Sequence, residues 1–226
     1  MAAKLSKKEL EGPDVFQSGI EKITDYIAEN KTRFHVIVAA ITLAIVIAIG
    51  TFFYWSDYQT SAKELYAKAQ DSLTKSISKQ EAAKGSVLIF KELIDKYPHS
   101  WSAKMALYHL GNIYYAQGDI DNAITSYKSY ISKTTADYAG IRFLALSSLG
   151  YCYESKNDLK SALIYFEQAQ KIKNNGFEAI GYRNIARIYE QMNDNKKALE
   201  NYQSALQKTI DPSMSIFIKR KIASLS

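Results

Sequence analysis

The fold is decided by residues 107–127, LYHLGNIYYAQGDIDNAITSY, because their pattern recurs twice further along the chain. The second copy is residues 146–166, LSSLGYCYESKNDLKSALIYF, and the third is residues 182–202, YRNIARIYEQMNDNKKALENY. All three copies carry large apolar or aromatic residues and small residues at the same internal positions. Repetition of this kind is typical of proteins built from stacked supersecondary units.

A pair of turn-forming residues divides each copy into two halves. These pairs are Gly118-Asp119, Asn157-Asp158 and Asn193-Asp194. Gly and Asn tolerate a left-handed backbone, and an Asp side chain accepts hydrogen bonds from the first N–H groups of a following helix. Each copy is therefore predicted to be a helical hairpin. Its small residues, such as Gly111 and Ala123, allow its two helices to approach closely.

The recurring positions resemble those of the tetratricopeptide repeat. The resemblance implies a helical solenoid with repeats near residues 104–137, 143–176 and 179–212. Two features depart from the usual pattern. Tyr130 occupies a position where a small residue is expected, and the proline that ends a repeat is absent or displaced to Pro212.

The segments on either side of the repeats are expected to complete the solenoid. Upstream, residues 62–78 and 81–97 resemble a degenerate hairpin. Residues 52–84 contain no glycine or proline, so the helix that precedes this hairpin is expected to run into it without a break. Downstream, a stripe of apolar residues at helical spacing predicts a C-terminal capping helix over the last repeat. The stripe consists of Met214, Phe217, Ile218, Ile222 and Leu225.

An uncharged run, VIVAAITLAIVIAIGTFFYW, extends from Val36 to Trp55. As a helix it would span about 30 Å, the thickness of a bilayer's hydrocarbon core. Its last four residues are aromatic, as is common at a membrane interface. We therefore predict an all-α protein in which a single transmembrane helix precedes a tetratricopeptide-like α-solenoid. The solenoid comprises one degenerate and three clear repeats and a C-terminal capping helix.

Two other interpretations of this run are less consistent with the sequence. A cleaved signal has an apolar stretch of about 7–15 residues near the N-terminus, followed by small residues. Here the run is longer, begins after thirty-five residues and ends in bulky side chains. A buried core helix rarely continues this far without a polar face, and the run offers only Thr42 and Thr51.

These features divide the chain into three predicted parts. Residues 1–33 form a cytoplasmic tail with an amphipathic helix, residues 34–55 form the anchor in membrane lipid, and residues 56–226 form the repeat domain. Basic residues accumulate on the cytoplasmic side of an anchor. The tail carries six of them, whereas only Lys63 and Lys68 lie close to the other end. The N-terminus is therefore expected in the cytoplasm and the repeats on the opposite side.

The sequence predicts no catalytic residue, no metal site and no cofactor site. His35, His99 and His109 lack metal-ligand spacing with one another or with Cys152, the only cysteine. No phosphate-binding loop or nucleophile motif is present. The net charge of +6 does not indicate a nucleic-acid partner, because the basic residues form no stripe interleaved with aromatics.

A concave groove lined by the first helix of each hairpin is the candidate binding surface. The resemblance assigns eight residues to this partner-binding groove: Tyr108, Asn112, Tyr115, Tyr151, Glu154, Arg183, Arg187 and Glu190. Tyrosine and arginine suit an extended polypeptide, because they offer apolar contact and forked donors. The tyrosines equally suit packing between repeats. Some tetratricopeptide domains hold a C-terminal carboxylate at set positions, of which only Asn112 matches, so recognition of that type is not expected.

Along its whole length the chain resembles the YfgM-type ancillary subunit of the bacterial Sec translocon. The resemblance rests on this layout, on Tyr26-Ile27-Ala28-Glu29-Asn30 before the anchor, and on the ending Lys221–Ser226. It implies a single-pass protein of the bacterial inner membrane with its repeats in the periplasm. Its implied partners are translocon subunits, a membrane-anchored chaperone, and unfolded or extended polypeptides. The sequence leaves the oligomeric state open.

Two alternatives remain, one for the function and one for the membrane side of the repeats. The chain is a structural scaffold if it copurifies stoichiometrically with a secretion, motility or outer-membrane assembly complex. The repeats face the cytoplasm if protease added outside the membrane leaves them intact.

Overall fold

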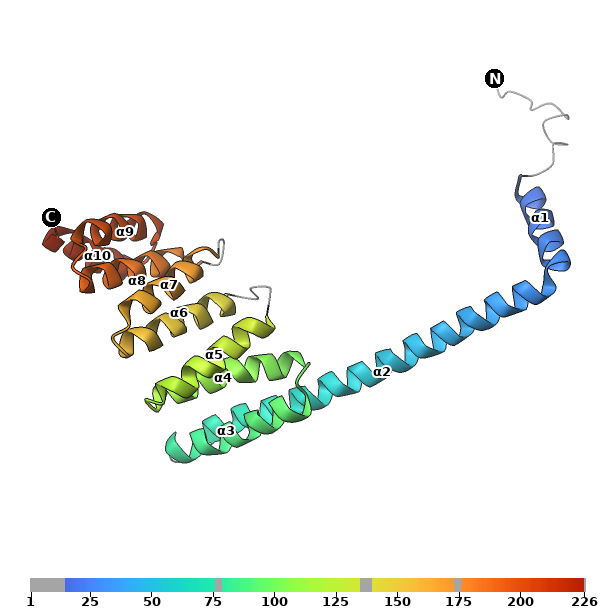
Figure 1. Cartoon of the computed structure of the whole chain (residues 1–226), viewed down its shortest axis with the longest axis horizontal. Coiled ribbons are helices and arrows are strands. Elements are labelled where there is room, and N and C mark those ends of the chain that lie inside the picture. Colours follow the sequence, from blue (N-terminus) through green and yellow to red (C-terminus); the bar gives the residue numbers. More distant parts are fainter. Residues whose placement is uncertain (1–14, 76–78, 135–139, 173–175, 226) are drawn as a thin grey trace, which may run out of the picture. The chain divides into compact units, whose positions relative to one another are not determined.

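The computed structural model describes residues 15–75, 79–134, 140–172 and 176–225. All regular elements in these ranges are α-helices (Figure 1). Their bounds are α1 Val15–Glu29, α2 Lys31–Lys75, α3 Lys79–Lys96, α4 Trp101–Ala116, α5 Ile120–Lys133, α6 Ile141–Ser155, α7 Leu159–Gln170, α8 Glu178–Gln191, α9 Asn195–Lys208 and α10 Pro212–Leu225. The chain divides into two compact units, Met1–Asp57 and Tyr58–Ser226.

The first unit contains α1 and the apolar part of α2. Helix α1 lies in the tail, where an amphipathic helix is predicted, and its apolar residues Ile20 and Ile23 have 46% and 61% of their surface exposed. Lys4, Lys7 and Lys8, which contribute to the predicted orientation, lie outside the described residues.

Of the described helices, α2 is the one long and apolar enough to cross a membrane. Its most apolar window has a mean hydropathy of 2.8, and none of that window is buried. Phe52, Phe53 and Tyr54, at the end of the run, are 67–70% exposed. Such exposure is expected of a segment that meets lipid and not of a core helix.

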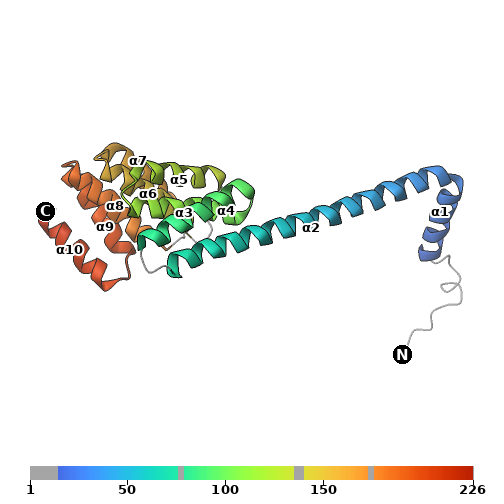
Figure 2. The same cartoon turned by 90° about the horizontal axis from the view of Figure 1, so that it is seen from below.

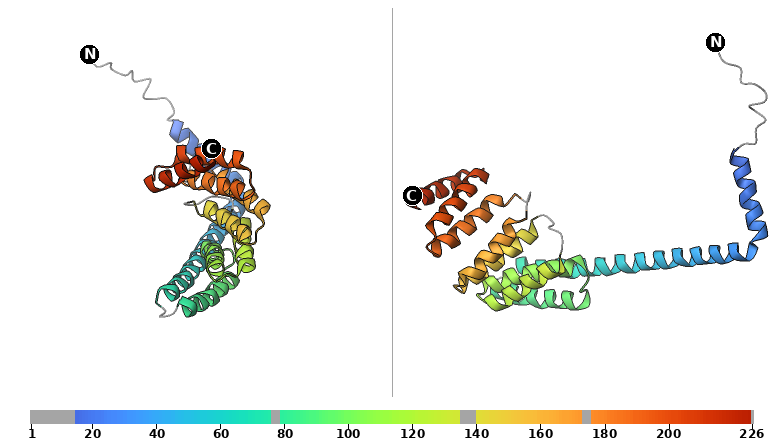
Figure 3. Two further views of the ribbon diagram at one scale, coloured as in Figure 1. Left: turned by 90° about the vertical axis from the view of Figure 1, so that its left-hand side faces the viewer. Right: turned by 45° about the horizontal axis from the view of Figure 1, so that its top comes forward.

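The second unit is a stack of helical hairpins that follows a curved path (Figures 1 and 3). The end of α2 and α3 form the predicted degenerate hairpin. In it, Ala62 and Phe90 are fully buried, and the Ser86 hydroxyl donates a hydrogen bond to the Ala69 carbonyl at 2.8 Å. The helix pairs α4–α5, α6–α7 and α8–α9 form the three clear repeats. The all-α repeat fold is thus confirmed.

The turn pairs adopt the predicted conformations. Gly118, Asn157 and Asn193 have φ of 78°, 58° and 60°, which is the left-handed region. The following aspartates cap the second helix of each hairpin by accepting a backbone N–H bond from the residue three positions on, over 3.1–3.3 Å. Each such cap stabilises its helix by about 1 kcal/mol.

The small residues also act as predicted. A Cβ atom on Gly150 would lie 2.6 Å from the ring of Phe166, and one on Gly111 would lie 2.5 Å from the ring of Tyr127. In each case the aromatic ring of the second helix therefore lies directly on the backbone of the first. This close contact sets the spacing of the hairpin.

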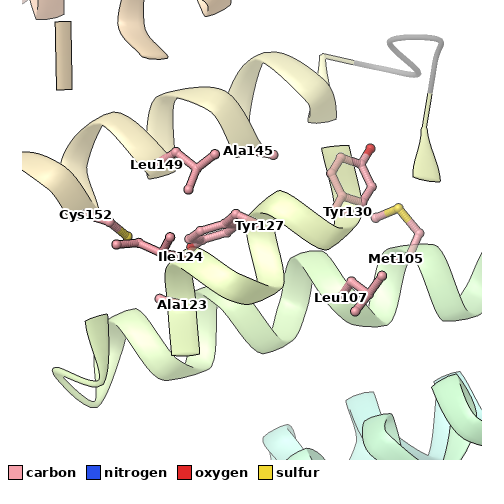
Figure 4. Packing of buried hydrophobic residues seen from close by; sticks show 9 residues of the cluster. All are labelled: Met105, Leu107, Ala123, Ile124, Tyr127, Tyr130, Ala145, Leu149 and Cys152. Atoms are coloured by element: carbon pink, nitrogen blue, oxygen red, sulfur yellow. The ribbon is translucent and has the colours of Figure 1, made fainter. Parts of the chain in front are cut away.

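Neighbouring repeats share apolar clusters of buried residues. Figure 4 shows Leu149 and Cys152 of α6 next to Ile124 and Tyr127 of α5. All four are at least nine-tenths buried. Full burial of a large apolar side chain stabilises a fold by roughly 1.5–3 kcal/mol, so the repeat-to-repeat contact is a main source of stability.

The C-terminal helix α10 covers the last repeat beside α9 (Figure 2). Ile218 is fully buried there, and Met214, Ile222 and Leu225 pack against the same cluster. Phe217 departs from the prediction, because 44% of its surface is exposed and it does not join this cluster. Because α10 packs against α9, Ile218 faces the α9 cluster, and the adjacent Phe217 lies on another side of the helix, where solvent reaches it.

A polar network joins the end of α2 to α4. The Nε2 atom of His109 lies 2.7 Å from the Tyr66 hydroxyl and 3.2 Å from the amide nitrogen of Gln70. The imidazole ring also stacks on Phe90 with a centroid separation of 5.8 Å. Burial lowers the pKa of His109 below its usual value, so the ring is held neutral at neutral pH.

Acidification is expected to destabilise this junction. The unfolded chain binds a proton at His109 near pH 6.5, whereas the folded chain binds it only at lower pH. The stability due to neutral His109 is therefore complete above about pH 6.5 and is lost progressively as the pH falls from there to the folded pKa. Urea unfolding of the wild type between about pH 7.5 and 5 measures the loss. The variant His109→Gln should show a flatter dependence, and an equal slope in both proteins would contradict the assignment.

Candidate functional site

The predicted groove residues on α4 take part in the packing of the first repeat. The Tyr108 ring lies 6.0 Å from the Tyr127 ring and 5.8 Å from the Tyr130 ring, measured between centroids. The side-chain oxygen of Asn112 accepts a hydrogen bond from the Tyr127 hydroxyl at 2.7 Å. Tyr115, in contrast, is 39% exposed. Of the predicted groove residues on α4, Tyr115 is therefore the one with an exposed aromatic side chain.

The groove residues on α6 and α8 come together in one cluster. Arg187 forms an ion pair with Glu154, with 2.5 Å between Nη1 and Oε1, and its guanidinium lies 5.4 Å from the centre of the Tyr151 ring. The sequence placed these residues on two different repeats, and the stacking of α8 against α7 and α6 brings them into contact.

Asn184 connects the remaining members of the cluster. Its side-chain oxygen accepts hydrogen bonds from the Tyr151 hydroxyl at 3.0 Å and from Nη2 of Arg183 at 3.2 Å. Asn184 is completely buried. The groove prediction did not include it. Its only sequence signal is a polar side chain within an otherwise apolar helix face.

Glu190 holds the C-terminal helix in place. It accepts a hydrogen bond from Nζ of Lys221 at 2.6 Å and from the Tyr202 hydroxyl at 2.8 Å. Burial by itself raises the pKa of Glu190, but the hydrogen bonds from Lys221 and Tyr202 outweigh burial and lower it. The carboxylate is therefore charged at neutral pH, and it links α8, α9 and α10.

A cleft of about 350 Å³ lies at this cluster. Its lining residues are Tyr151, Arg183, Arg187, Tyr202 and Phe217. Three of these are predicted groove residues, whereas Tyr202 is the last aromatic residue of the third copy and Phe217 belongs to the predicted apolar stripe of the C-terminal helix. The cleft thus combines aromatic walls with guanidinium groups, a composition that suits a polypeptide with apolar and acidic groups.

The groups that could hold a metal ion are His, Asp and Glu side chains and the single cysteine, Cys152. No group of three or more His, Cys, Asp or Glu side chains in the described ranges is placed to hold a metal ion. Cys152 is buried, and burial raises the pKa of its thiol to about 11. Its thiol is therefore protonated at neutral pH and is a weak nucleophile.

Comparison with solved structures finds a similar fold in MamA. The crystal structure of MamA is 21% identical, with a TM-score of 0.53, and the match covers 66% of this chain and 82% of MamA. PcrH from Pseudomonas aeruginosa is 19% identical, with a TM-score of 0.49, and its match covers 56% of this chain and 93% of PcrH. A search of the curated proteins gives no match.

A family model provides the broadest match. The model described as "Tetratricopeptide repeat-like domain" matches residues 31–226, which include the apolar part of α2 as well as every repeat. Because this match spans most of the chain, the protein belongs to the tetratricopeptide repeat-like family.

Proposed function

We propose that this protein is a membrane-tethered binding module for other proteins, and that it acts as an ancillary, chaperone-like subunit of the bacterial Sec translocon. In this role it is not an enzyme. The observation that carries the proposal is the cleft between Tyr151, Arg183 and Phe217, because it combines the exposed ring of Phe217 with a half-buried tyrosine and a half-buried arginine on a fold that mediates protein–protein interaction.

The apolar part of α2 supports the tether. It is long enough to span a bilayer, its apolar window is wholly exposed, and the family match includes it. Val, Ile, Leu and Phe supply eleven of the residues from Val36 to Trp55, which together favour insertion by roughly 3–7 kcal/mol.

The excess of basic residues before the anchor supports a periplasmic location for the repeats. The YfgM-type layout supports the Sec translocon as the partner. A tether of this kind raises the local concentration of the cleft near polypeptides that emerge from the membrane.

Site-specific photocrosslinking in native membranes tests the proposal. A photoreactive residue is placed at Phe217, which lines the cleft, or at Ile164 of α7, which is 52% exposed and does not line it. Adducts with translocon subunits or newly exported chains are expected at Phe217 and not at Ile164. Stoichiometric adducts with an unrelated envelope complex would replace the proposal with the scaffold function. Equal yields at both positions would exclude the cleft as the contact site.

A further inference from the structure

The charges around the cleft do not cancel. Arg187 is paired with Glu154, and Lys221 is paired with Glu190. Arg183 has no carboxylate partner among the described residues, and its hydrogen bond goes to the neutral side chain of Asn184. The cluster therefore carries one uncompensated positive charge, on a residue that lines the cleft.

Two buried donor atoms beside Arg183 are also unused. The side-chain oxygen of Asn184 accepts two hydrogen bonds, whereas its Nδ2 atom is buried and has no acceptor among the described residues. The Nη2 atom of Arg187 is likewise buried and has no acceptor among the described residues. Buried polar groups are normally paired, and a group left unpaired is destabilising. The cluster thus has a surplus of donors over acceptors at the place where it has a surplus of positive charge.

The aromatic residues that line the cleft indicate which kind of side chain would bind next to an anionic group. The Tyr202 hydroxyl donates to Glu190 and the Tyr151 hydroxyl donates to Asn184, so both hydroxyls are already in use. Tyr202 is completely buried, so the accessible ring surface of the cleft comes from Tyr151 and Phe217, and it favours an apolar side chain.

We propose that the cleft binds a carboxylate of an extended polypeptide, with Arg183 as its ionic partner and a neighbouring apolar side chain against Phe217; this rests on the proposed function. One uncompensated charge matches a monoanionic carboxylate better than a doubly charged phosphate. A carboxylate is also an acceptor for a second guanidinium, and Arg187, whose Nη2 atom is unused, lines the same cleft. The carboxylate belongs either to an Asp or Glu side chain or to the C-terminus of the bound chain.

Four short labelled peptides distinguish these sources. All consist of Gly and Ser with a Phe near the C-terminus. The first ends in a free carboxylate, the second ends in an amide, the third is the amide with a Glu beside the Phe, and the fourth is the amide with Gln in place of that Glu. Binding to the full-length protein in detergent micelles is measured by fluorescence anisotropy. We expect the first peptide, the third peptide or both to bind about tenfold to a hundredfold more tightly than their uncharged counterparts.

The variant Arg183→Gln tests whether Arg183 is the ionic partner of the carboxylate. Glutamine retains a donor for Asn184 but removes the charge, so the advantage of the charged peptides should disappear while the uncharged peptides bind as before. Arg220→Gln is the matched control, since Arg220 is exposed on α10 and does not line the cleft. Circular dichroism melting establishes that both variants are folded. Arg183→Lys should restore part of the advantage, because lysine keeps the charge without the fork.

Equal binding of charged and uncharged peptides would overturn the inference, as would an equal loss in Arg183→Gln and Arg220→Gln. Photocrosslinking from Phe217 in the Arg183→Gln protein separates this failure from that of the proposed function. If translocon adducts persist although no carboxylate preference exists, the proposed function stands and the carboxylate site is wrong. If wild-type Phe217 gives no such adducts, the proposed function itself fails, whatever the peptides show.

Discussion

Replacing Phe166 with alanine is expected to destabilise the repeat domain by about 3–5 kcal/mol, a large part of the 5–15 kcal/mol that a domain typically has. Phe166 is completely buried, and its ring lies on the backbone of Gly150 and 5.1 Å from the ring of Tyr151. It also belongs to the apolar cluster that joins the second repeat to Ile185 and Ile188 of the third. Alanine would leave a cavity between two repeats, and stacked repeats depend on such nearest-neighbour contacts.

Urea unfolding followed by circular dichroism measures this loss. Ile164→Ala is the control on the same helix, because Ile164 is 52% exposed and its truncation should change the free energy of unfolding by less than about 1 kcal/mol. Phe166→Ala should also weaken peptide binding, since Tyr151 loses the ring behind it. Similar unfolding midpoints for the two variants would show that Phe166 does not hold the repeats together.

Two lysines in the middle of the apolar helix are expected to release the protein from the membrane. In the variant with Leu43→Lys and Ile47→Lys, the two charges cost roughly 6–8 kcal/mol of insertion free energy, once the lost apolar contributions are included. This cost is about equal to or larger than the roughly 3–7 kcal/mol that favours insertion of the wild-type run. We expect the wild type in the pellet of carbonate-washed membranes and the variant in the supernatant.

The control for the anchor places the same charges elsewhere. Leu88 and Ile164 are 69% and 52% exposed on the repeat domain, so Leu88→Lys with Ile164→Lys should leave the protein in the pellet. Protease added to spheroplasts of the wild type should remove the repeat domain if it lies in the periplasm. Survival of the domain would place it in the cytoplasm, and extraction of the wild type by carbonate would exclude the anchor.

The hairpins were predictable from the sequence because the chemistry that makes them is local. A left-handed residue followed by a capping Asp stops one helix and starts the next within two positions, as at Asn157 and Asp158. A glycine such as Gly150 and a ring such as Phe166 recur at a constant separation, since both belong to one hairpin. These signals depend on residues that lie close together in the chain.

The binding surface was only partly predictable. Helical periodicity indicates the face of a helix, but not whether a neighbouring repeat covers that face. Tyr108 and Tyr151 were assigned to the groove on the same grounds, yet Tyr108 packs on two rings of its own repeat and Tyr151 lines the cleft. The second copy begins 39 residues after the first, and the third begins 36 residues after the second. The repeats therefore do not stack uniformly, and equivalent positions in two repeats have different surroundings.

The sequence by itself determined the helical hairpins, their turns and the uncharged run, because turn chemistry, side-chain size and length are properties of short segments. Only the tertiary structure decided that Phe217 is exposed and that Glu190 accepts hydrogen bonds from Lys221 and Tyr202. It also decided that Arg183 has no carboxylate partner within the part of the chain that the structure describes. The physical reason is that pairing of charges and exposure of rings depend on which helices meet, and α8 and α10 meet only after the repeats have stacked.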